Sequence, residues 1–422
     1  MEADKSRYGL IGEKLGHSYS KIIHEMLGYG YDLWEIRPDE LSGFMKKADF
    51  DGINVTIPYK RAVMEYLDEV SEEALRIGAV NTVYKKDGRL IGTNTDYTGL
   101  RYAAARAGID LKGRKVLVLG GTGGAGGMAC TLAEDEGAGQ VFVASRRAPE
   151  EKADPEGRVT VTYDDIPSDI EVIINASPVG MYPLTDGSLV EPADIPGLEG
   201  VIDLIYNPLR TKLVRRAEAL GVRASGGLAM LVRQATDAAG YFRGEDFSSR
   251  TEDILRRIEL ETENIVLIGM PGCGKSSIGR RVARRLGRRF VDTDMAVKEK
   301  TGRHPSDIIR EDGEAAFRDI EQEVIEETAR EHSLVIATGG GAVKREANTD
   351  ALRMNGRLFF IKRDPAKLST KGRPLSQGVG LRKMYAERRP MYEAAADVII
   401  HNEGRSFEPA ARRIAKRYRD TE

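Results

Sequence analysis

Cysteine is almost absent from this sequence of 422 residues, which contains only Cys130 and Cys273. Two cysteines far apart in the chain argue against a disulfide framework and against a cysteine-rich zinc site. The five histidines are scattered and lack the spacing of metal ligands. This composition fits a protein of a reducing compartment, and we expect it to be cytoplasmic.

An excess of charge of one sign is also missing, as is any long apolar run. The 64 basic and 66 acidic residues leave a net charge of −2, which favours neither a nucleic acid nor an anionic membrane as a partner. The first residues, Met1–Arg7, contain no apolar segment of the kind that directs secretion. We therefore expect small-molecule substrates and no membrane or nucleic-acid partner, with the oligomeric state open between monomer and homodimer.

Glycine, by contrast, is frequent, with 46 residues, and two glycine clusters have the form of phosphate-binding loops. Gly121–Gly126 (GTGGAG) follows the apolar run Lys115–Gly120, and Gly269–Ser276 (GMPGCGKS) follows Asn264–Ile268. A glycine turn between a strand and a helix lets backbone N–H groups at the helix N-terminus approach phosphate. The first cluster is typical of a dinucleotide site, and the second matches the P-loop pattern GxxxxGK[ST]. The sequence therefore predicts a redox nucleotide in the first half and an ATP-type nucleotide in the second.

A chain of this length exceeds what one hydrophobic core usually serves, so we expect several domains. The predicted fold class is α/β, with an N-terminal α/β substrate domain, a Rossmann domain and a P-loop kinase domain with a parallel sheet. We place these domains at residues 1–100, 101–240 and 263–422, with a linker or helix at 241–262. The C-terminal helix of the Rossmann domain is expected to return to the first domain.

Short apolar runs mark the expected strands. In the first domain they are Tyr8–Ile11, Asp32–Ile36 and Ile53–Ile57, followed by a hairpin around Asp87 and Gly88. In the second domain they are Val116–Gly120, Val141–Ala144, Val159–Tyr163, Val172–Asn175 and Val201–Ile205. A helical run is expected around Asp253–Ile258.

The choice of dinucleotide is made at the end of the second Rossmann strand, where an acidic residue normally binds the ribose 2′-hydroxyl of NAD. Here the strand ends in Ser145-Arg146-Arg147, without an acid. Paired guanidinium groups suit the additional 2′-phosphate of NADP, although both arginines could also be exposed turn residues. We predict NADPH/NADP, with these three residues and the glycine loop as its binding site; the loop residues are Gly121, Gly123, Gly124, Ala125 and Gly126.

Four polar clusters interrupt the apolar pattern of the first half. They are His17–Ser20, Asn54–Lys60, Gly78–Thr82 and Asn94–Asp96. Together with the later segments Ile174–Pro183, Asp203–Lys212 and Gly227–Gln234, they resemble the shikimate dehydrogenase family from about Tyr8 to the end of the first half. The resemblance implies reversible NADPH-dependent reduction of 3-dehydroshikimate to shikimate, in a cleft between a substrate domain and a Rossmann domain.

Reduction of a ketone by hydride needs a proton for the new alkoxide, and a lysine beside a carboxylate can deliver it. Lys60 and Asp96 look like that pair, although Lys60 could also be an exposed cation at a helix start. The resemblance implies that Ser18 and Ser20 hold the substrate carboxylate, while the ring is contacted by Thr56, Asn81, Tyr206 and Gln234 and the cofactor by Met230. Singly, the two serines could be turn or capping residues and Asn81 a hairpin residue. Lys21 stands where family members usually carry proline.

The second half can first be interpreted chemically. In a P-loop the backbone N–H groups wrap the phosphates, Lys275 reaches the β- and γ-phosphates, and Ser276 ligates Mg²⁺. Asp292 and Asp294 lie two residues apart at the end of an expected strand, so both side chains should project from the same face. One carboxylate can then serve the metal and the other the substrate. The predicted nucleotide contacts are Gly272, Gly274, Lys275, Ser276 and Ser277.

From Asn264 to its C-terminus the chain resembles shikimate kinase. The resemblance implies that Asp292 supports Mg²⁺, that Asp294 accepts a hydrogen bond from the hydroxyl to be phosphorylated, and that Arg373 belongs to a mobile lid. Arg318 and Arg388 provide the charge that a carboxylate substrate needs, and Gly339, Gly340 and Gly341 allow close backbone approach. Alternatively, Arg318 could pair with Asp319 or Glu321, and Arg388 with Glu387 or Glu393, on exposed helices.

The product of the first half is the substrate of the second. We therefore predict a bifunctional enzyme of aromatic amino-acid biosynthesis that makes shikimate 3-phosphate from 3-dehydroshikimate, using NADPH and then ATP with Mg²⁺. One alternative is a non-catalytic pathway sensor that retains both ligand pockets, and the acid/base and metal-supporting residues speak against it. A second alternative widens the first reaction to quinate and dehydroquinate.

Overall fold

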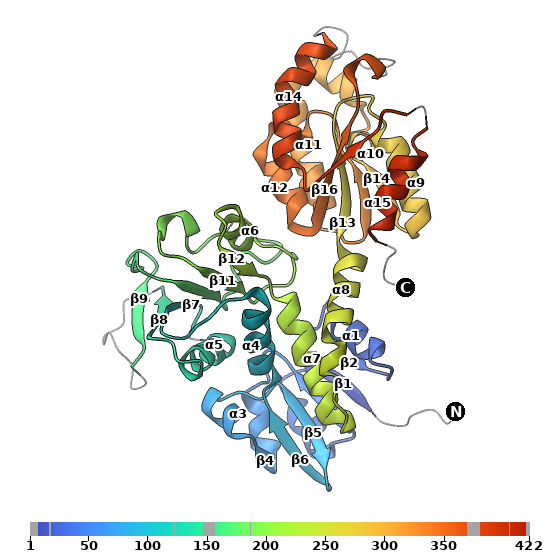
Figure 1. Ribbon diagram of the computed structural model, residues 1–422. Helices are drawn as coiled ribbons and strands as arrows, with labels where there is room; N and C mark the ends of the chain where they lie inside the picture. Colours follow the sequence, from blue (N-terminus) through green and yellow to red (C-terminus); the bar gives the residue numbers. More distant parts are fainter. Residues whose placement is uncertain are drawn as a thin grey trace. The chain divides into compact units, whose positions relative to one another are not determined.

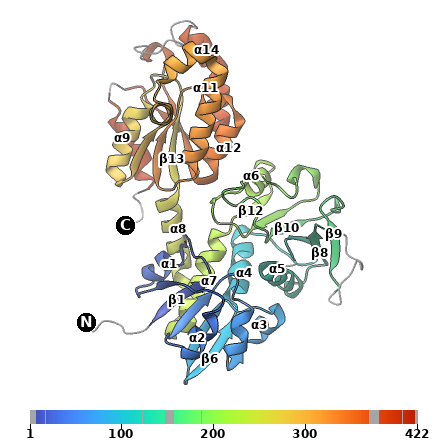
Figure 2. The same cartoon turned by 180° about the vertical axis from the view of Figure 1, so that it is seen from behind.

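The chain divides into two compact units, Met1–Arg256 and Arg257–Glu422. The computed structural model (Figures 1 and 2) describes residues 7–16, 18–121, 123–146, 157–185, 187–368, 380–404 and 406–418. The boundary falls within helix α8 (Thr251–Thr262), in the segment 241–262. None of the helices in the described ranges is both long and apolar enough to cross a membrane.

The first lobe of the N-terminal unit is built around a mixed sheet with the strand order β2-β1-β3-β5-β6-β4. Its strands are β1 (Tyr8–Gly12), β2 (Asp32–Glu35), β3 (Gly52–Val55), β4 (Glu69–Val70), β5 (Thr82–Lys86) and β6 (Arg89–Thr93). Its helices are α1 (Ser20–Met26), α2 (Leu41–Lys47), α3 (Glu72–Ile77) and α4 (Thr95–Ala107). Strands β1 and β3 are buried along their whole length, as expected where both faces of a sheet are covered.

Turn chemistry fixes two features of this lobe. The predicted hairpin is confirmed, because β5 and β6 pair antiparallel and the turn residues Asp87 and Gly88 both have positive φ, as a tight two-residue hairpin turn requires. Strand β3 ends at Val55, before the predicted end at Ile57, because the Tyr59 N–H turns back to the Thr56 carbonyl at 2.9 Å. The polar residues that follow β3 are therefore in a loop at the edge of the sheet.

The second lobe contains a parallel sheet in the order β12-β11-β10-β7-β8-β9. The chain order reverses between β7 and β10, as in a doubly wound dinucleotide-binding sheet, in which the ligand lies at the carboxyl ends of the strands near the reversal. The strands are β7 (Lys115–Leu119), β8 (Gln140–Ser145), β9 (Val159–Thr162), β10 (Val172–Asn175), β11 (Gly200–Asp203) and β12 (Arg223–Ser225). Helices α5 (Gly124–Asp135) and α6 (Lys212–Ala219) belong to this lobe. The predicted Rossmann fold is confirmed.

Helix α7 (Leu228–Arg243) follows the second lobe in the sequence but packs on the first, against α1 and α4 (Figures 1 and 2). The Phe242 ring stacks on Tyr8, with 5.4 Å between the ring centroids. Glycine at position 52 makes this contact possible, since a Cβ there would lie 2.3 Å from the Phe242 ring. Gly99 likewise allows α4 to lie close to α7, because a Cβ at position 99 would lie 2.7 Å from the Met230 carbonyl oxygen. Helix α7 thus ties the second lobe to the first.

The C-terminal unit contains one parallel sheet in the order β14-β15-β13-β16-β17. Its strands are β13 (Asn264–Ile268), β14 (Arg289–Asp292), β15 (Leu334–Ala337), β16 (Gly356–Lys362) and β17 (Val398–His401). Its helices are α9 (Lys275–Leu286), α10 (Thr293–Thr301), α11 (Pro305–Ala329), α12 (Glu346–Asn355), α14 (Leu381–Ala395) and α15 (Glu408–Lys416). Helix α11 is interrupted at Gly313, where φ is 91°. Strand β13 is fully buried, and the chain order reverses between it and β15, which again predicts a ligand site at their carboxyl ends.

Short 3₁₀ helices complete the described elements: η1 (Ala62–Tyr66), η2 (Pro192–Asp194), η3 (Ser248–Arg250), η4 (Ala342–Lys344) and η5 (Pro365–Lys367).

The turn from β7 into α5 depends on close backbone contact at Gly126. A Cβ at this position would lie 2.3 Å from the Gly120 carbonyl oxygen and 2.4 Å from the Gly121 Cα. We expect Gly126→Ala to destabilise the N-terminal unit by about 1–3 kcal/mol, because backbone atoms cannot move aside cheaply. Unfolding in urea, followed by the fluorescence of Trp34, reports on this unit, since Trp34 is the only tryptophan of the chain.

Gly127→Ala is the matched control for this prediction. The neighbouring glycine lies in the same helix, but a Cβ there would meet no atom within 4 Å. Alanine in an open helical position is expected to stabilise by about 0.5–1 kcal/mol. Equal effects of the two substitutions would contradict the proposed contact.

Candidate active sites

Lys60 and Asp96 form an ion pair in the first lobe, with 2.5 Å between Lys60 Nζ and Asp96 Oδ2. Lys60 follows β3, and its carbonyl accepts a hydrogen bond from the Val80 N–H at 2.8 Å. Asp96 lies in the first turn of α4, where the Asn94 side chain caps the helix by accepting the Asp96 N–H. The helix N-terminus favours the negative charge of Asp96. The side chains of Lys60 and Asp96 remain 26% and 17% exposed, so the pair is accessible to a ligand.

The remaining predicted substrate residues of this half lie on several elements. Ser20 begins α1 and is buried, with its N–H donating to Ser18 Oγ at 3.2 Å. The Val55 N–H donates to the Asn81 carbonyl at 2.8 Å, which places Asn81 beside the end of β3, next to Thr56. Gln234 is buried on α7, and its Cβ would lie 3.1 Å from a Cβ at Gly99 of α4. The fold therefore brings together segments that are far apart in the sequence.

Tyr206 follows β11 in the second lobe and lies against Tyr19 of the first, with 5.7 Å between the ring centroids. Burial and the neighbouring Tyr206 raise the pKa of Tyr19 to about 12, and burial also raises the pKa of Tyr206. Both hydroxyls are therefore neutral hydrogen-bonding groups at physiological pH. Lys21, in place of the family's usual proline, forms a helical ion pair with Glu25 at 3.7 Å.

The dinucleotide loop lies at the start of α5. Gly123 is the N-cap residue of the helix and has no side chain to occupy the backbone N–H groups. A Cβ added at Gly124 would meet no atom within 4 Å. Backbone N–H groups at this helix end can therefore face an anion, with Ala125 in the same first turn. Arg146 follows Ser145 at the end of β8 and is exposed, and that strand end carries no acid. This donor set fits NADP, whereas Arg147 lies outside the described residues.

Asp203 supports the loop that carries Tyr206. Its carboxylate is fully buried and accepts hydrogen bonds from Thr211 Oγ1 at 2.6 Å, Asn175 Nδ2 at 3.0 Å and the Ile205 N–H at 3.0 Å. The Ile205 bond turns the chain, and β11 therefore ends at Asp203 and not at the predicted Ile205. Burial raises the pKa of Asp203 to about 6, against the opposing effect of its three hydrogen bonds.

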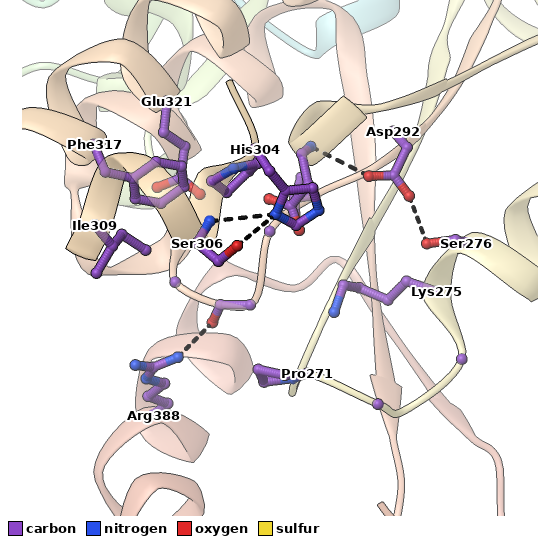
Figure 3. A pocket seen from close by; sticks show the side chains of 18 of the residues that line it. Pro271, Lys275, Ser276, Asp292, His304, Ser306, Ile309, Phe317, Glu321 and Arg388 are labelled. Atoms are coloured by element: carbon purple, nitrogen blue, oxygen red, sulfur yellow. Dashed lines mark hydrogen bonds between the residues drawn. The ribbon is translucent and has the colours of Figure 1, made fainter. Parts of the chain in front are cut away.

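In the C-terminal unit a cavity of about 420 Å³ opens at the carboxyl ends of β13 and β15 (Figure 3). It is lined by every predicted site residue of this half that the structure describes. These are Gly272, Gly274, Lys275, Ser276, Ser277, Asp292, Asp294, Arg318, Gly339, Gly340, Gly341 and Arg388. Arg373 lies outside the described residues.

One end of this cavity has the donors for a nucleotide and its metal. Lys275 is 8% exposed, and its Nζ donates to the carbonyls of Gly269 at 2.7 Å and Met270 at 3.0 Å. Ser276 Oγ donates to Asp292 Oδ2 at 2.6 Å, and Figure 3 shows the two side chains facing each other. Both are oxygen ligands of the kind that Mg²⁺ prefers.

The expectation that Asp292 and Asp294 both project from a strand end is wrong. Strand β14 ends at Asp292, whose Oδ1 accepts the Asp294 N–H at 3.2 Å and thereby caps helix α10. Asp294 consequently lies in the first helical turn. It still lines the cavity, and burial, together with the charge of Asp292, raises its pKa.

Two buried arginines lie on the other side of the cavity. Arg318 is 7% exposed and pairs with Glu321 and with Glu314, whose Oε1 lies 3.0 Å from Nη2. A Cβ at Gly341 would lie 2.1 Å from Arg318 Nη2, so a side chain there would displace the guanidinium from its pairing with Glu321. Arg388 Nη1 donates to the Gly340 carbonyl at 3.1 Å (Figure 3). These side chains are not on exposed helix faces.

Of the alternative ion pairs considered for Arg318 and Arg388, only the one between Arg318 and Glu321 is present among the ion pairs of the described residues. Glu321 does pair with Arg318, whereas Asp319 pairs with Arg345. Glu393 pairs with Lys362 and Arg389. Sequence reasoning did not identify Glu321 as a cavity residue, although its i,i+3 spacing from Arg318 on a helix was a usable signal. His304, Phe317 and Phe407 also line the cavity, and no sequence signal pointed to them.

Comparisons with known proteins agree with both halves of this description. A family model described as "Shikimate dehydrogenase substrate binding domain" matches residues 10–83, and one described as "Shikimate kinase" matches residues 271–419. The shikimate dehydrogenase (NADP(+)) of Clostridium beijerinckii is 40% identical over 243 residues, which cover 55% of this chain and 89% of that protein. The chain belongs to the shikimate dehydrogenase family.

Solved structures give the same result for this dehydrogenase half. A chorismate mutase/shikimate 5-dehydrogenase fusion protein from Clostridium acetobutylicum is 35% identical with a TM-score of 0.55, covering 60% of this chain and 96% of that one. Shikimate 5-dehydrogenase from Thermus thermophilus, in complex with NADP(H) and shikimate, is 34% identical with a TM-score of 0.53, covering 60% and 99%.

The chain is therefore a bifunctional enzyme that joins a shikimate dehydrogenase half to a shikimate kinase domain. The predicted cofactors, NADP for the first half and ATP with Mg²⁺ for the second, are confirmed by these families.

The raised pKa of Asp203 predicts a pH dependence of stability. A carboxyl whose pKa rises from 3.8 to about 6 on folding stabilises the folded state most below pH 4 and loses that contribution as the pH rises through 6. The shift corresponds to about 3 kcal/mol. We expect the unfolding free energy of the unchanged protein to fall relative to that of Asp203→Asn between pH 4 and 7.5, as measured by urea unfolding with Trp34 fluorescence.

Asp246 is the control for this measurement. Hydrogen bonds from Ser248 lower the pKa of this exposed carboxyl, so its contribution has the opposite sign and disappears as the pH falls. Stability curves of the unchanged protein and Asp203→Asn that stay parallel across this range would refute the role assigned to Asp203.

Proposed function

We propose that this chain reduces 3-dehydroshikimate to shikimate with NADPH and then phosphorylates shikimate to shikimate 3-phosphate with ATP. The observation that carries the proposal is the presence, in one chain, of the Lys60–Asp96 pair beside a dinucleotide fold and of a P-loop cavity with buried arginines. The product of the first reaction is the substrate of the second. We assign the first reaction to domains at residues 1–100 and 101–240 and the second to residues 263–422, joined through 241–262.

In the first reaction, Ser18 and Ser20 bind the substrate carboxylate through neutral hydroxyls, and the ring hydroxyls are bound by Thr56, Asn81, Tyr206 and Gln234. NADPH, when bound at the glycine loop and Arg146, supplies the hydride. Lys60 Nζ donates a proton to the oxygen that was the ketone. Asp96 Oδ2, at 2.5 Å, holds the ammonium group in place and stabilises its charge.

In the second reaction, Arg318 and Arg388 bind the shikimate carboxylate through charge-assisted hydrogen bonds. Asp294 accepts a hydrogen bond from the hydroxyl that is phosphorylated and aligns its oxygen. ATP supplies the phosphoryl group, with Mg²⁺ held by Ser276 and Asp292. Lys275 then exchanges its carbonyl partners in the loop for phosphate oxygens and neutralises their charge, which is the main need of phosphoryl transfer.

A coupled assay tests the proposal. The chain is incubated with 3-dehydroshikimate, NADPH, ATP and Mg²⁺, omitting each nucleotide in turn, while NADPH oxidation and shikimate 3-phosphate are followed. We expect shikimate to accumulate without ATP and phosphorylated product to require both nucleotides. Binding of both substrates without turnover would refute the proposal.

Single substitutions should separate the two activities. Lys60→Ala removes the proton donor and is expected to lower the reduction rate by about 10²–10⁴ while shikimate phosphorylation stays unchanged. Lys275→Ala should abolish phosphorylation and leave reduction intact, because the two lysines lie in different units. The retained activity of each variant controls for the amount of intact chain in the assay, and the loss of both activities in either variant would contradict independent sites.

A further inference from the structure

A buried group of hydrogen-bonded side chains lies beneath the proposed shikimate site of the dehydrogenase half. Each member is at most 4% exposed; the members are Tyr31, Asn54, Asn81, Thr82 and Thr95. We call this group the Thr82 cluster. Asn81 is the member proposed to contact substrate, so the other four are candidates for controlling how its amide is presented.

The orientation of the Asn81 amide is fixed by a backbone donor. The Thr95 N–H lies 2.7 Å from Asn81 Oδ1. Since a backbone N–H can only donate, the amide atom that faces it must be oxygen, and Nδ2 must point the other way. Among the described residues Nδ2 donates to Thr95 Oγ1 at 3.1 Å. One of its two hydrogens is therefore left for a substrate hydroxyl.

Thr82 holds this arrangement together. Its Oγ1 lies 2.9 Å from Asn81 Oδ1 and 3.0 Å from Thr95 Oγ1, and it accepts a hydrogen bond from Asn54 Nδ2 at 3.1 Å. Asn54 is oriented in turn, because its Oδ1 accepts the Tyr31 hydroxyl at 2.7 Å. A fully buried hydroxyl with three partners cannot rotate to serve another role without leaving one of them unsatisfied.

The cluster also connects Asn81 to the catalytic pair. Thr95 is the first residue of α4 and directly precedes Asp96, and the Asn81 carbonyl accepts the Val55 N–H at the end of β3. The Asn81 amide and Asp96 are therefore held at the same helix start, although the Asp96 N–H itself is capped by Asn94 and does not depend on Asn81. Thr82 touches neither Lys60 nor Asp96 through any hydrogen bond between described residues, so its effect must pass through its neighbours.

We propose that Thr82 is a positioning residue of the dehydrogenase, whose hydroxyl, together with the Thr95 N–H, holds the Asn81 amide in the orientation that offers an N–H to a hydroxyl of shikimate. The inference rests on the function proposed for this half. It assigns to the hydroxyl an effect on substrate affinity, beyond its contribution to packing in the sheet.

Two substitutions at this position separate the hydroxyl from the volume of the side chain. Thr82→Val keeps the shape and removes the hydroxyl, whereas Thr82→Ser keeps the hydroxyl and removes a methyl group. Shikimate oxidation with NADP⁺ is measured, with phosphorylation of shikimate by the same chain as the control for protein concentration and Trp34 fluorescence as the control for folding of the N-terminal unit. We expect Thr82→Val to raise the KM for shikimate about tenfold with little change in kcat or in the KM for NADP⁺, and Thr82→Ser to stay close to the unchanged protein.

A double substitution tests whether the effect passes through Asn81. In an Asn81→Ala background, Thr82→Val should raise the KM for shikimate no further, because the amide that it positions is gone. Tyr31→Phe, which releases Asn54 without altering Thr82, should raise the KM in the same direction by a smaller factor. Trp34 fluorescence shows whether Thr82→Val folds. If it does not fold, Tyr31→Phe alone still tests the inference.

An unchanged KM in both Thr82→Val and Tyr31→Phe, or equal losses in Thr82→Val and Thr82→Ser, would overturn the inference alone. Full additivity with Asn81→Ala would do the same. Failure of the unchanged chain to oxidise shikimate would instead remove the proposed function, and the inference with it.

Discussion

Parallel pairing of buried strands is the constraint on which both nucleotide loops depend. In a parallel sheet the carboxyl ends of neighbouring strands meet at one edge, and the loops that follow them can converge on a ligand. Strand β13 pairs with β15 and β16, so that the P-loop after β13 and the glycines after β15 face one cavity. The same geometry places the loop after β7 beside the end of β8. The two nucleotide loops are thus located by hydrogen bonds between largely apolar strands.

The first lobe reaches the same result with a mixed sheet. Strand β5 runs antiparallel to β3 and β6, with Thr82 paired with both Asn54 and Thr93. The end of β3, the start of β5 and the end of β6 consequently meet at one edge. Lys60, Asn81 and Asp96, which are separated by turns and a hairpin in the sequence, become neighbours for that reason. Here an antiparallel hairpin brings the strand ends together, whereas in the parallel sheets crossover connections do so.

Much of this could be predicted from the sequence, because the decisive signals are local. The glycine loops, the strands that precede them and the hairpin around Asp87 and Gly88 each occupy a few consecutive residues. The P-loop residues and Asp292 could be found because they lie at or just after the ends of strands, whereas Arg318 and Arg388 lie within helices and were found from the family resemblance. The position of Asp294 was predicted wrongly because the side chain of Asp292 caps a helix where a continuing strand was expected, and both outcomes fit the same residues.

Contacts between residues far apart in the chain could not be predicted from local sequence patterns. The i,i+3 spacing of Glu321 from Arg318 indicates an ion pair, but it does not show that Glu321 is 1% exposed, since an acidic residue on a helix usually faces solvent. The Thr82 cluster combines residues from four places in the chain, and only Asn81 and Thr82 are neighbours in the sequence. Such groups depend on strand register, which single-sequence patterns specify only where one face of a strand is apolar.

The close approach of Gly341 to the Arg318 guanidinium has a consequence for how this domain can vary in evolution. Any side chain at position 341 would occupy the space of the arginine head group, so the two positions form one unit of change. A lineage that loses the buried arginine is free to replace the glycine, whereas a lineage that keeps the arginine is expected to keep the glycine. Across related sequences, residues 318 and 341 should therefore covary, and a departure at both together would mark a domain that has exchanged its anionic substrate for another.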